Sequence, residues 1–222
     1  MEWSALNLSL ELAFWTCLIL LPLAVLIGRA LAWNTFRGKA FVEALVAVPL
    51  VLPPTVLGYY LILSFGDASS IGRFYHAITG HNLVFSFDGL LLASIIFNLP
   101  FAVQPMQRAF EAVPMNVREA AWCCGMSHWV TFWRIELPLA WTGILSALVL
   151  TFAHTLGEFG VVLMMGGNIP EETRTLSIAI YDRVQMFDYG AAGTMSAVLL
   201  TLSVLAITFV YVLSYRRRQY HA

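Results

Sequence analysis

The sequence predicts an all-α integral membrane protein with about five transmembrane helices. Hydrophobic residues make up 59% of its 222 residues and charged residues only 11%, whereas about a quarter of a soluble globular domain is charged. The charged residues also cluster, and they leave five uncharged stretches, each close to the roughly 20 residues with which a helix crosses a bilayer. Both observations argue against a water-soluble fold. The net charge of -1, with basic residues spread along the chain, gives no sign of a nucleic-acid partner.

Five spans are predicted, and they form one transmembrane domain over residues 1–222. Their approximate limits are residues 10–32, 44–65, 88–107, 137–157 and 189–214. The first has neither a basic segment before it nor a small-residue cleavage site after it, so we expect a retained span rather than a signal peptide. The segment 158–188 has an uncharged run of only twelve residues. Such a run is short for a span and predicts a periplasmic or re-entrant segment.

The basic residues predict the orientation of the spans. Of the twelve lysines and arginines, nine follow spans one, three and five, and only Arg73, Arg174 and Arg183 lie in the other loops. The nine are Arg29, Arg37, Lys39, Arg108, Arg118, Arg134, Arg216, Arg217 and Arg218. Because loops rich in lysine and arginine remain in the cytoplasm, we expect a periplasmic N-terminus and a cytoplasmic C-terminus.

The second span is rich in proline. Pro49, Pro53 and Pro54 interrupt its apolar sequence, and Gly58 follows them. Proline removes a backbone donor and clashes with the preceding turn, so this helix must be kinked or broken. In a membrane the freed carbonyl groups are tolerated where they are buried in protein or face a water-filled cavity. The span is either an ordinary kinked helix or part of the lining of a pathway, for which Pro53, Pro54 and Gly58 are candidates.

The predicted cytoplasmic loop 108–136 is expected to form a hairpin of two short helices. Pro114 suits a first helical position and Gly125 a C-terminal cap. Ser127 can cap a second helix that runs towards Pro138.

One face of this hairpin is a candidate docking surface. The small side chains of Ala120 and Ala121 would let another protein pack closely, and Glu119 offers a charge beside them. The alternative is an amphipathic loop that lies on the bilayer.

The outer end of span four carries two ionisable residues. His154 and Glu158 are four residues apart, so on a helix they would share one face and could make a charge-assisted contact. An ionisable residue within a membrane is a candidate functional residue, although Glu158 is close enough to the end of the span to reach water. Gly157, Glu158 and Gly160 are therefore further pathway or gate candidates. So is Arg174, the single arginine of the turn-rich stretch that follows.

Several kinds of chemistry have no motif in this sequence. There is no Gly-x-x-x-x-Gly-Lys-Ser/Thr phosphate loop, no Ser-His-Asp set and no zinc-ligand spacing. Cys17, Cys123 and Cys124 match no metal-site pattern and are expected to act as small hydrophobic residues. We therefore expect no catalysis, metal or cofactor in this chain, and no ATP site of the phosphate-loop type.

The hairpin resembles the EAA loop of ABC-importer permeases. The pattern runs from Glu119-Ala120-Ala121 through Gly125 to Ile135 and Leu137-Pro138, and every spacing of the family pattern is met. In that family this loop forms a coupling helix that sits in a cleft of the ATPase subunit. The resemblance assigns ATPase coupling to Glu119, Ala120, Ala121 and Gly125.

Two further segments resemble molybdate permeases in particular. These are the proline-rich string of span two and the run Gly157-Glu158-Phe159-Gly160, which is followed by Gly167-Asn168-Ile169-Pro170 and Glu172-Thr173-Arg174-Thr175. The chain departs from the family at Glu171, where glycine is common, and at Trp122-Cys123-Cys124, where the family has Arg-Thr-Leu. Because like charges repel, we expect Glu158 to hold a helix end or a gate rather than to touch an oxyanion.

The resemblance implies a complete transport system. It predicts the type I ABC importer permease fold, similar to that of MetI, in the bacterial cytoplasmic membrane. Its partners would be a second copy of the chain, two cytoplasmic ATP-binding subunits, a periplasmic molybdate-binding protein and membrane lipid.

Two alternatives stay open. The same machine could carry tungstate or sulfate, or the chain could be an autonomous channel or secondary transporter, which would ordinarily have an ion-coupling carboxylate at mid-membrane; none of the predicted spans has one.

Overall fold

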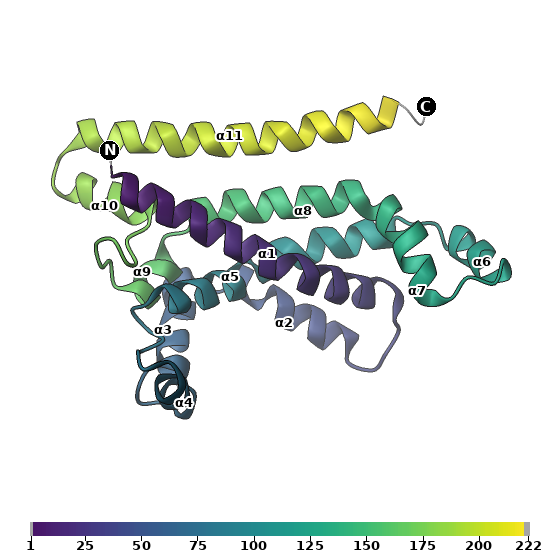
Figure 1. The fold of residues 1–222 in the computed structure, drawn as a ribbon, viewed down its shortest axis with the longest axis horizontal. Helices are drawn as coiled ribbons and strands as arrows, with labels where there is room; N and C mark the ends of the chain where they lie inside the picture. Colours follow the sequence, from purple (N-terminus) through teal and green to yellow (C-terminus); the bar gives the residue numbers. More distant parts are fainter. Residues whose placement is uncertain (1, 220–222) are drawn as a thin grey trace.

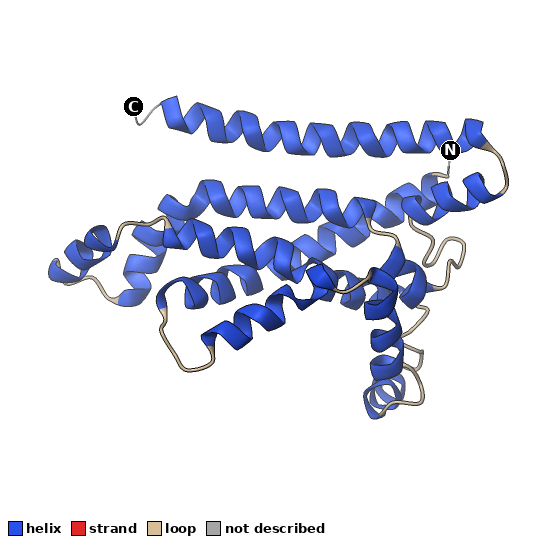
Figure 2. Ribbon diagram, turned by 180° about the vertical axis from the view of Figure 1, so that it is seen from behind, coloured by secondary structure: helices blue, strands red, loops and turns tan. Residues whose placement is uncertain are grey.

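The computed structural model describes residues 2–219, and every regular element in that range is a helix (Figures 1 and 2). In chain order they are α1 (Trp3–Trp33), α2 (Lys39–Val51), α3 (Pro54–Phe65), α4 (Ser70–Thr79), α5 (Phe87–Glu111), α6 (Met115–Cys123), α7 (His128–Thr131), a π-helical turn η1 (Phe132–Glu136), α8 (Leu137–Gly157), α9 (Gly160–Gly166), α10 (Leu176–Gln185) and α11 (Tyr189–Gln219). The prediction of an all-α protein is confirmed.

Within the described residues, four helical stretches are long and apolar enough to cross a membrane: Trp3–Trp33, Phe87–Glu111, His128–Gly157 and Tyr189–Phe209. A fifth span is formed if α2 and α3 are counted together, although the chain bends by 111° between them. The axes of the long helices α1, α5, α8 and α11 are roughly aligned, with α8 running opposite to α1 and α11, and α3 and α4 project to one side (Figures 1 and 2). By length and composition, the described residues therefore contain four spans, or five if α2 and α3 together form one, in agreement with the expected number of about five.

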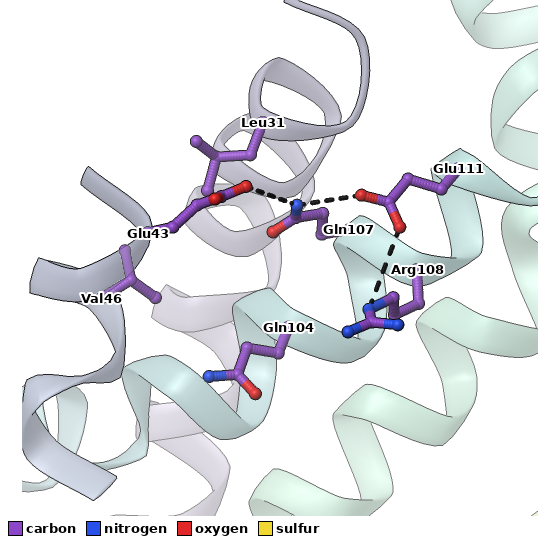
Figure 3. A pocket seen from close by; sticks show the side chains of 7 residues that line it. All are labelled: Leu31, Glu43, Val46, Gln104, Gln107, Arg108 and Glu111. Carbon is purple, nitrogen blue, oxygen red and sulfur yellow. Dashed lines mark hydrogen bonds and ion pairs between the residues drawn. The ribbon is translucent and has the colours of Figure 1, made fainter. Parts of the chain in front are cut away.

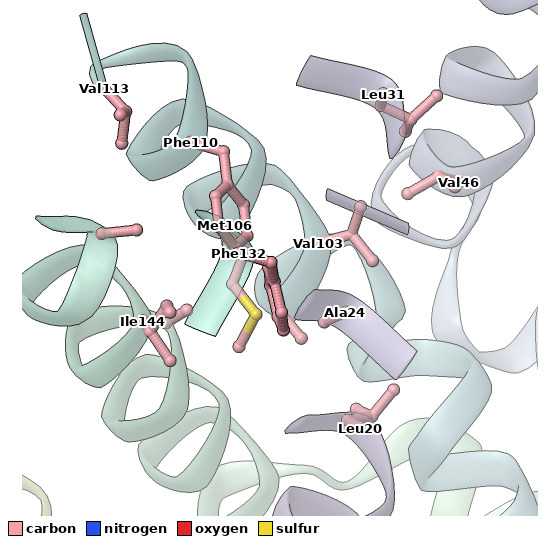
Figure 4. Close-up of a cluster of buried hydrophobic side chains, with 13 residues drawn as sticks. Leu20, Ala24, Leu31, Val46, Val103, Met106, Phe110, Val113, Phe132 and Ile144 are labelled. Atoms are coloured by element: carbon pink, nitrogen blue, oxygen red, sulfur yellow. The ribbon is translucent and has the colours of Figure 1, made fainter. Parts of the chain in front are cut away.

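The core of the bundle lies between α1, α5 and α8. Its largest cluster of buried apolar side chains is shown in Figure 4 and includes Leu20, Met106, Phe110 and Ile144. Small residues bring the backbones close, since a Cβ atom added at Gly28 would lie 2.9 Å from the Gln107 backbone nitrogen. Close backbone approach at small residues is the usual way in which helices pack in lipid, where no hydrophobic force drives them together.

The second span is broken rather than kinked. Helix α2 ends at Val51, Leu52 has extended backbone angles, and α3 begins at Pro54. Pro54 stands at the first helical position, where its missing N–H is not needed. The alternative of an ordinary kinked helix is wrong for this span.

The hairpin differs from its prediction in three respects. Helix α5 extends to Glu111, so the loop is shorter than expected. Pro114 occupies the position before α6 rather than its first helical position. Gly125 ends α6 as predicted, because it follows the cap residue Cys124 in the left-handed conformation, with a φ of +80°. The second helix does not stop near Pro138 but continues through η1 into α8. Pro138 lacks the N–H of a regular helix, and the wide turn η1 directly before it lets the chain continue. The Ser127 cap is as predicted, and its Oγ accepts from Val130 N at 3.3 Å.

Candidate translocation pathway and coupling surface

The break in span two lies against helix α9. A Cβ atom added at Gly160 would stand 2.8 Å from the Cβ of Pro54, and one added at Gly58 would stand 2.6 Å from the Cβ of Met164. Glycine is required at both positions because any side chain would push α3 and α9 apart. The structure thus brings together three of the residues that the sequence suggested: Pro54, Gly58 and Gly160.

A second helix break lies next to the first. Helix α8 ends at Gly157, Glu158 has extended backbone angles, and α9 begins at Gly160. No heavy atom lies within 4 Å of a Cβ added at Gly157, so this glycine is not enforced by close packing. Interrupted helices in a membrane place unpaired backbone groups at one level, and such groups persist where they are buried in protein or line a cavity.

The Glu158 carboxylate is buried, with only 4% of the residue exposed. Its Oε2 accepts hydrogen bonds from Ser94 Oγ at 3.0 Å and from Asn98 Nδ2 at 3.1 Å. Ser94 Oγ in turn accepts from Thr16 Oγ1 at 3.1 Å, so the cluster joins α1, α5 and the end of α8. The expectation that Glu158 reaches water is wrong within this subunit.

His154 and Glu158 do not pair directly. His154 Nδ1 hydrogen-bonds Asn98 Oδ1 at 2.8 Å, and the His154 ring stacks on Phe101 with 3.8 Å between centroids. Asn98 therefore stands between the two residues and binds one with its oxygen and the other with its nitrogen. The i, i+4 contact fails because α8 ends at Gly157 and Glu158 leaves the helical path.

Arg174 is held apart from the two breaks. Its Nε donates to Asn168 Oδ1 at 2.7 Å, and its guanidinium pairs with Asp182 at 3.7 Å and with Glu2 at 3.8 Å. These contacts tie the turn before α10 to the N-terminal end of α1. Arg174 is thus satisfied by carboxylates rather than directed at Pro53 or Pro54.

Helix α6 projects at the end of the bundle opposite the N-terminus (Figure 1). Glu119 and Ala120 are exposed on it, as is Gly125 in the turn that follows. Ala121 is only 4% exposed and faces the bundle, so the low surface expected from it is not on the outer face. Met115 and Val117, which sequence reasoning missed, are exposed apolar residues of the same helix.

An ion cluster behind α6 was also missed. The buried carboxylate of Glu136 accepts hydrogen bonds from Arg118 on α6 and Arg29 on α1. The only signal in the sequence was the single acidic residue between Ile135 and Pro138. Nothing there pointed to its two partners, of which Arg118 is 18 and Arg29 is 107 residues away along the chain.

A pocket of about 430 Å³ opens beside the end of α5 (Figure 3). Gln107 Nε2 donates to Glu43 Oε1 and to Glu111 Oε1, each at 3.0 Å, and so bridges α2 and α5. Arg108 lies 3.9 Å from Glu111 at the rim. This polar site belongs to neither helix break and holds the start of α2 against the bundle.

Comparison with known proteins identifies the family. The model of the family described as "Binding-protein-dependent transport system inner membrane component" matches residues 21–219. The chain belongs to this family. It is therefore a multi-pass permease of the inner membrane and a transport component rather than an enzyme, as expected.

The permease is similar along nearly its whole length to curated relatives. The Molybdenum transport system permease protein ModB of Azotobacter vinelandii is 43% identical over 94% of this chain and 92% of its own length. ModB of Escherichia coli K12 is 35% identical over 94% of this chain and 91% of its own. The probable sulfate transport system permease protein cysT of Chlorella vulgaris is 31% identical over 93% of this chain and 77% of its own.

Solved structures agree on the fold. A bacterial ABC transporter involved in the import of alginate superposes with a TM-score of 0.76 at 17% identity, over 96% of this chain and 78% of that one. The MetNI methionine ABC transporter gives a TM-score of 0.63 at 19% identity, over 100% of this chain and 94% of that one. The predicted type I importer permease fold is confirmed.

Proposed function

We propose that this permease carries molybdate across the cytoplasmic membrane in an ATP-driven importer. The observation that carries the proposal is the 43% identity to a molybdenum permease over almost the full length of both chains. The relatives named as sulfate permeases are less similar, at 31% identity, and sulfate, like tungstate, remains the second candidate cargo.

The two adjacent helix breaks form the gate in this proposal. Pro54 on one side meets Gly160 on the other, and Gly58 lies against Met164 of α9; Pro53 directly precedes α3, while Gly157 and Glu158 form the turn between α8 and α9. The contact between Pro54 and Gly160 involves no flexible side chain, so in this proposal a rotation of α9 opens or closes it. Glu158 acts by holding the end of α8 through Ser94 and Asn98, not by touching the anion. Arg174 holds the turn before α10 in place.

Helix α6 is the surface on which the ATP-binding subunit docks. Glu119 and Ala120 face outward with Gly125 close by, and Met115 and Val117 supply exposed apolar area. A convex helix with one charge and several small or apolar residues suits a cleft in a partner protein. Ala121 contributes from the inner side, where its small size lets α6 lie close to the bundle.

The functional unit contains two copies of this chain, two ATP-binding subunits and a periplasmic binding protein. The support for a second copy is the broad apolar surface of α2 and α3, where Phe41 is 72% and Val51 is 81% exposed. Such a surface needs either lipid or a partner. Its location beside the helix break favours a pathway formed between two copies. In this proposal the N-terminal end of α1 faces the periplasm, and α6 faces the cytoplasm.

ATPase activity of the whole complex in liposomes tests this function. The permease is reconstituted with its ATP-binding subunit and with binding protein loaded with molybdate, tungstate or sulfate, and Glu119→Arg is compared with the native chain. We expect molybdate-loaded protein to stimulate hydrolysis most strongly and the variant to lose the stimulation. Equal or stronger stimulation by sulfate would reassign the cargo, and an unaffected variant would remove the coupling role from α6.

A further inference from the structure

Glu136 lies at the point where α6, α1 and α8 meet. It is the last residue of the π-helical turn η1 and immediately precedes α8. Its side chain is fully buried, and its oxygens accept from Arg29 Nε at 2.7 Å and from Arg118 Nε at 3.0 Å. Arg29 belongs to α1 and Arg118 to α6, so one carboxylate binds two helices while it stands at the start of a third.

Aromatic rings fix the arginines from the other side. The Cζ atom of Arg118 lies 3.6 Å from the centroid of the Trp33 ring, and that of Arg29 lies 5.2 Å from the Phe132 ring. A guanidinium between a carboxylate and an aromatic face gains both charge pairing and cation–π attraction. Only 8% of the Arg118 side chain is exposed. The pair of Arg118 and Glu136 is therefore shielded from water that could replace its contacts, whereas 30% of the Arg29 side chain is exposed.

Arg118 and Glu119 are neighbours on α6, and the first is buried while the second is exposed. Glu119 is exposed on the outer side of α6, and Arg118 points inward to Glu136. A push on the outer face of α6 must therefore displace the Arg118 guanidinium together with the helix. Separating buried charges leaves each of them unpaired, which costs far more than breaking a surface ion pair.

From this arrangement we infer that Glu136 and Arg118 are positioning residues that transmit the movement of α6 to α1 and α8. The cluster of Arg29, Arg118, Glu136 and Trp33 moves as one unit, so α6 cannot rotate without shifting the ends of two transmembrane helices. The π-helical turn η1 supplies the place where α8 can adjust, because such turns are wider than regular helix. The inference rests on the proposed docking of the ATP-binding subunit on α6.

The test separates docking from transmission. Glu136→Gln is prepared in the full complex in liposomes, and three quantities are measured: assembly with the ATP-binding subunit, basal ATPase activity, and stimulation by molybdate-loaded binding protein. We expect assembly and basal activity like those of the native complex, with stimulation reduced about tenfold, a size typical of coupling between sites. Arg134→Gln is the matched control, since Arg134 lies in the same turn but is exposed, and it should retain full stimulation.

An exchange of charges provides the decisive variant. Arg118→Glu and Glu136→Arg are made singly and together; each single change should lose stimulation, and the double change, which again places one acid among two arginines, should recover a substantial part of it. Recovery supports the inference when the single variants assemble like the native complex and lack only stimulation, because a role in folding alone would leave stimulation intact in an assembled complex. Full stimulation in Glu136→Gln would overturn the inference, as would an assembled double variant without stimulation. Failure of both Glu136→Gln and the double variant to assemble would assign the cluster to folding and equally overturn it.

The control for the underlying function is Glu119→Arg in the same preparation. If Glu119→Arg abolishes stimulation while Glu136→Gln does not, α6 is the docking helix and the inference that Glu136 transmits its movement is wrong. If Glu119→Arg has no effect, the proposed docking surface itself is wrong.

Discussion

Gly160 approaches Pro54 so closely that a Cβ atom at residue 160 would stand 2.8 Å from the Cβ of the proline. The contact joins the beginning of α9 to the beginning of α3, the two half-length helices that follow the two breaks. A contact between a glycine and a proline ring leaves no flexible side chain to move aside. The packing of the proposed gate therefore depends on the absence of a side chain at one residue.

Gly160→Ala should impair the permease at this contact. The added methyl group forces α3 and α9 apart, and overpacking of this kind costs about 1–3 kcal/mol. We expect a lower Tm of the detergent-solubilised complex and weaker stimulation of its ATPase by loaded binding protein. Gly193→Ala on α11 is the control, because no heavy atom lies within 4 Å of a Cβ at that position. Equal behaviour of the two variants would show that the gate contact is looser than the structure describes.

Replacement of Glu158 should affect stability according to what the new side chain can accept. In Glu158→Ala, Ser94 Oγ loses its buried acceptor and Asn98 Nδ2 loses one of its acceptors, at a cost of about 1–3 kcal/mol. Glu158→Gln keeps an amide oxygen for the same donors and should lose less. Thermal unfolding of the solubilised permease measures both.

Glu172→Gln is the control for that series, since Glu172 is exposed and lies in the next turn region. The Glu172→Gln variant should have the same Tm as the native permease. A glutamine variant less stable than the alanine variant would contradict the acceptor role given to the Glu158 carboxylate.

Gln107 should tolerate no further negative charge. Its Nε2 donates to Glu43 and Glu111, so Gln107→Glu removes the shared donor and places three carboxylates around one pocket (Figure 3). We expect a loss of about 1–3 kcal/mol in stability, seen as a lower Tm. Gln104→Glu lines the same pocket and is exposed, so it should have a much smaller effect. A larger effect at residue 104 would argue against the bridging role of Gln107.

The native cysteines report the orientation of the chain. Cys123 and Cys124 are exposed at the end of α6, whereas Cys17 is buried. With α6 in the cytoplasm, a membrane-impermeant maleimide should label inside-out vesicles that contain the permease without its partner subunits and should leave right-side-out vesicles unlabelled.

A cysteine at Ser70, the exposed first residue of α4, provides the opposite reporter. In a chain with Cys123 and Cys124 changed to serine, Ser70→Cys should label only in right-side-out vesicles. Labelling of both reporters from the same side would overturn the orientation predicted from the arginines and lysines.

The sequence by itself determined the class of the protein and the place where its second span is interrupted. Uncharged apolar stretches of about 20 residues are typical of membrane-spanning helices. Pro53 and Pro54 cannot both continue a helix. Both conclusions therefore follow from local chemistry. The helical hairpin for which we propose a coupling role was also visible, because its spacing from Glu119 to Pro138 is a matter of chain order.

Only the tertiary structure decided which of these residues meet. The approach of Gly160 to Pro54, the place of Asn98 between His154 and Glu158, and the two arginines on Glu136 each join residues far apart in the chain. Composition and periodicity fix which face of a helix is apolar, but not which neighbour that face finds. The inward direction of Ala121 has the same cause, because the orientation of α6 depends on the ion pair between Arg118 and Glu136.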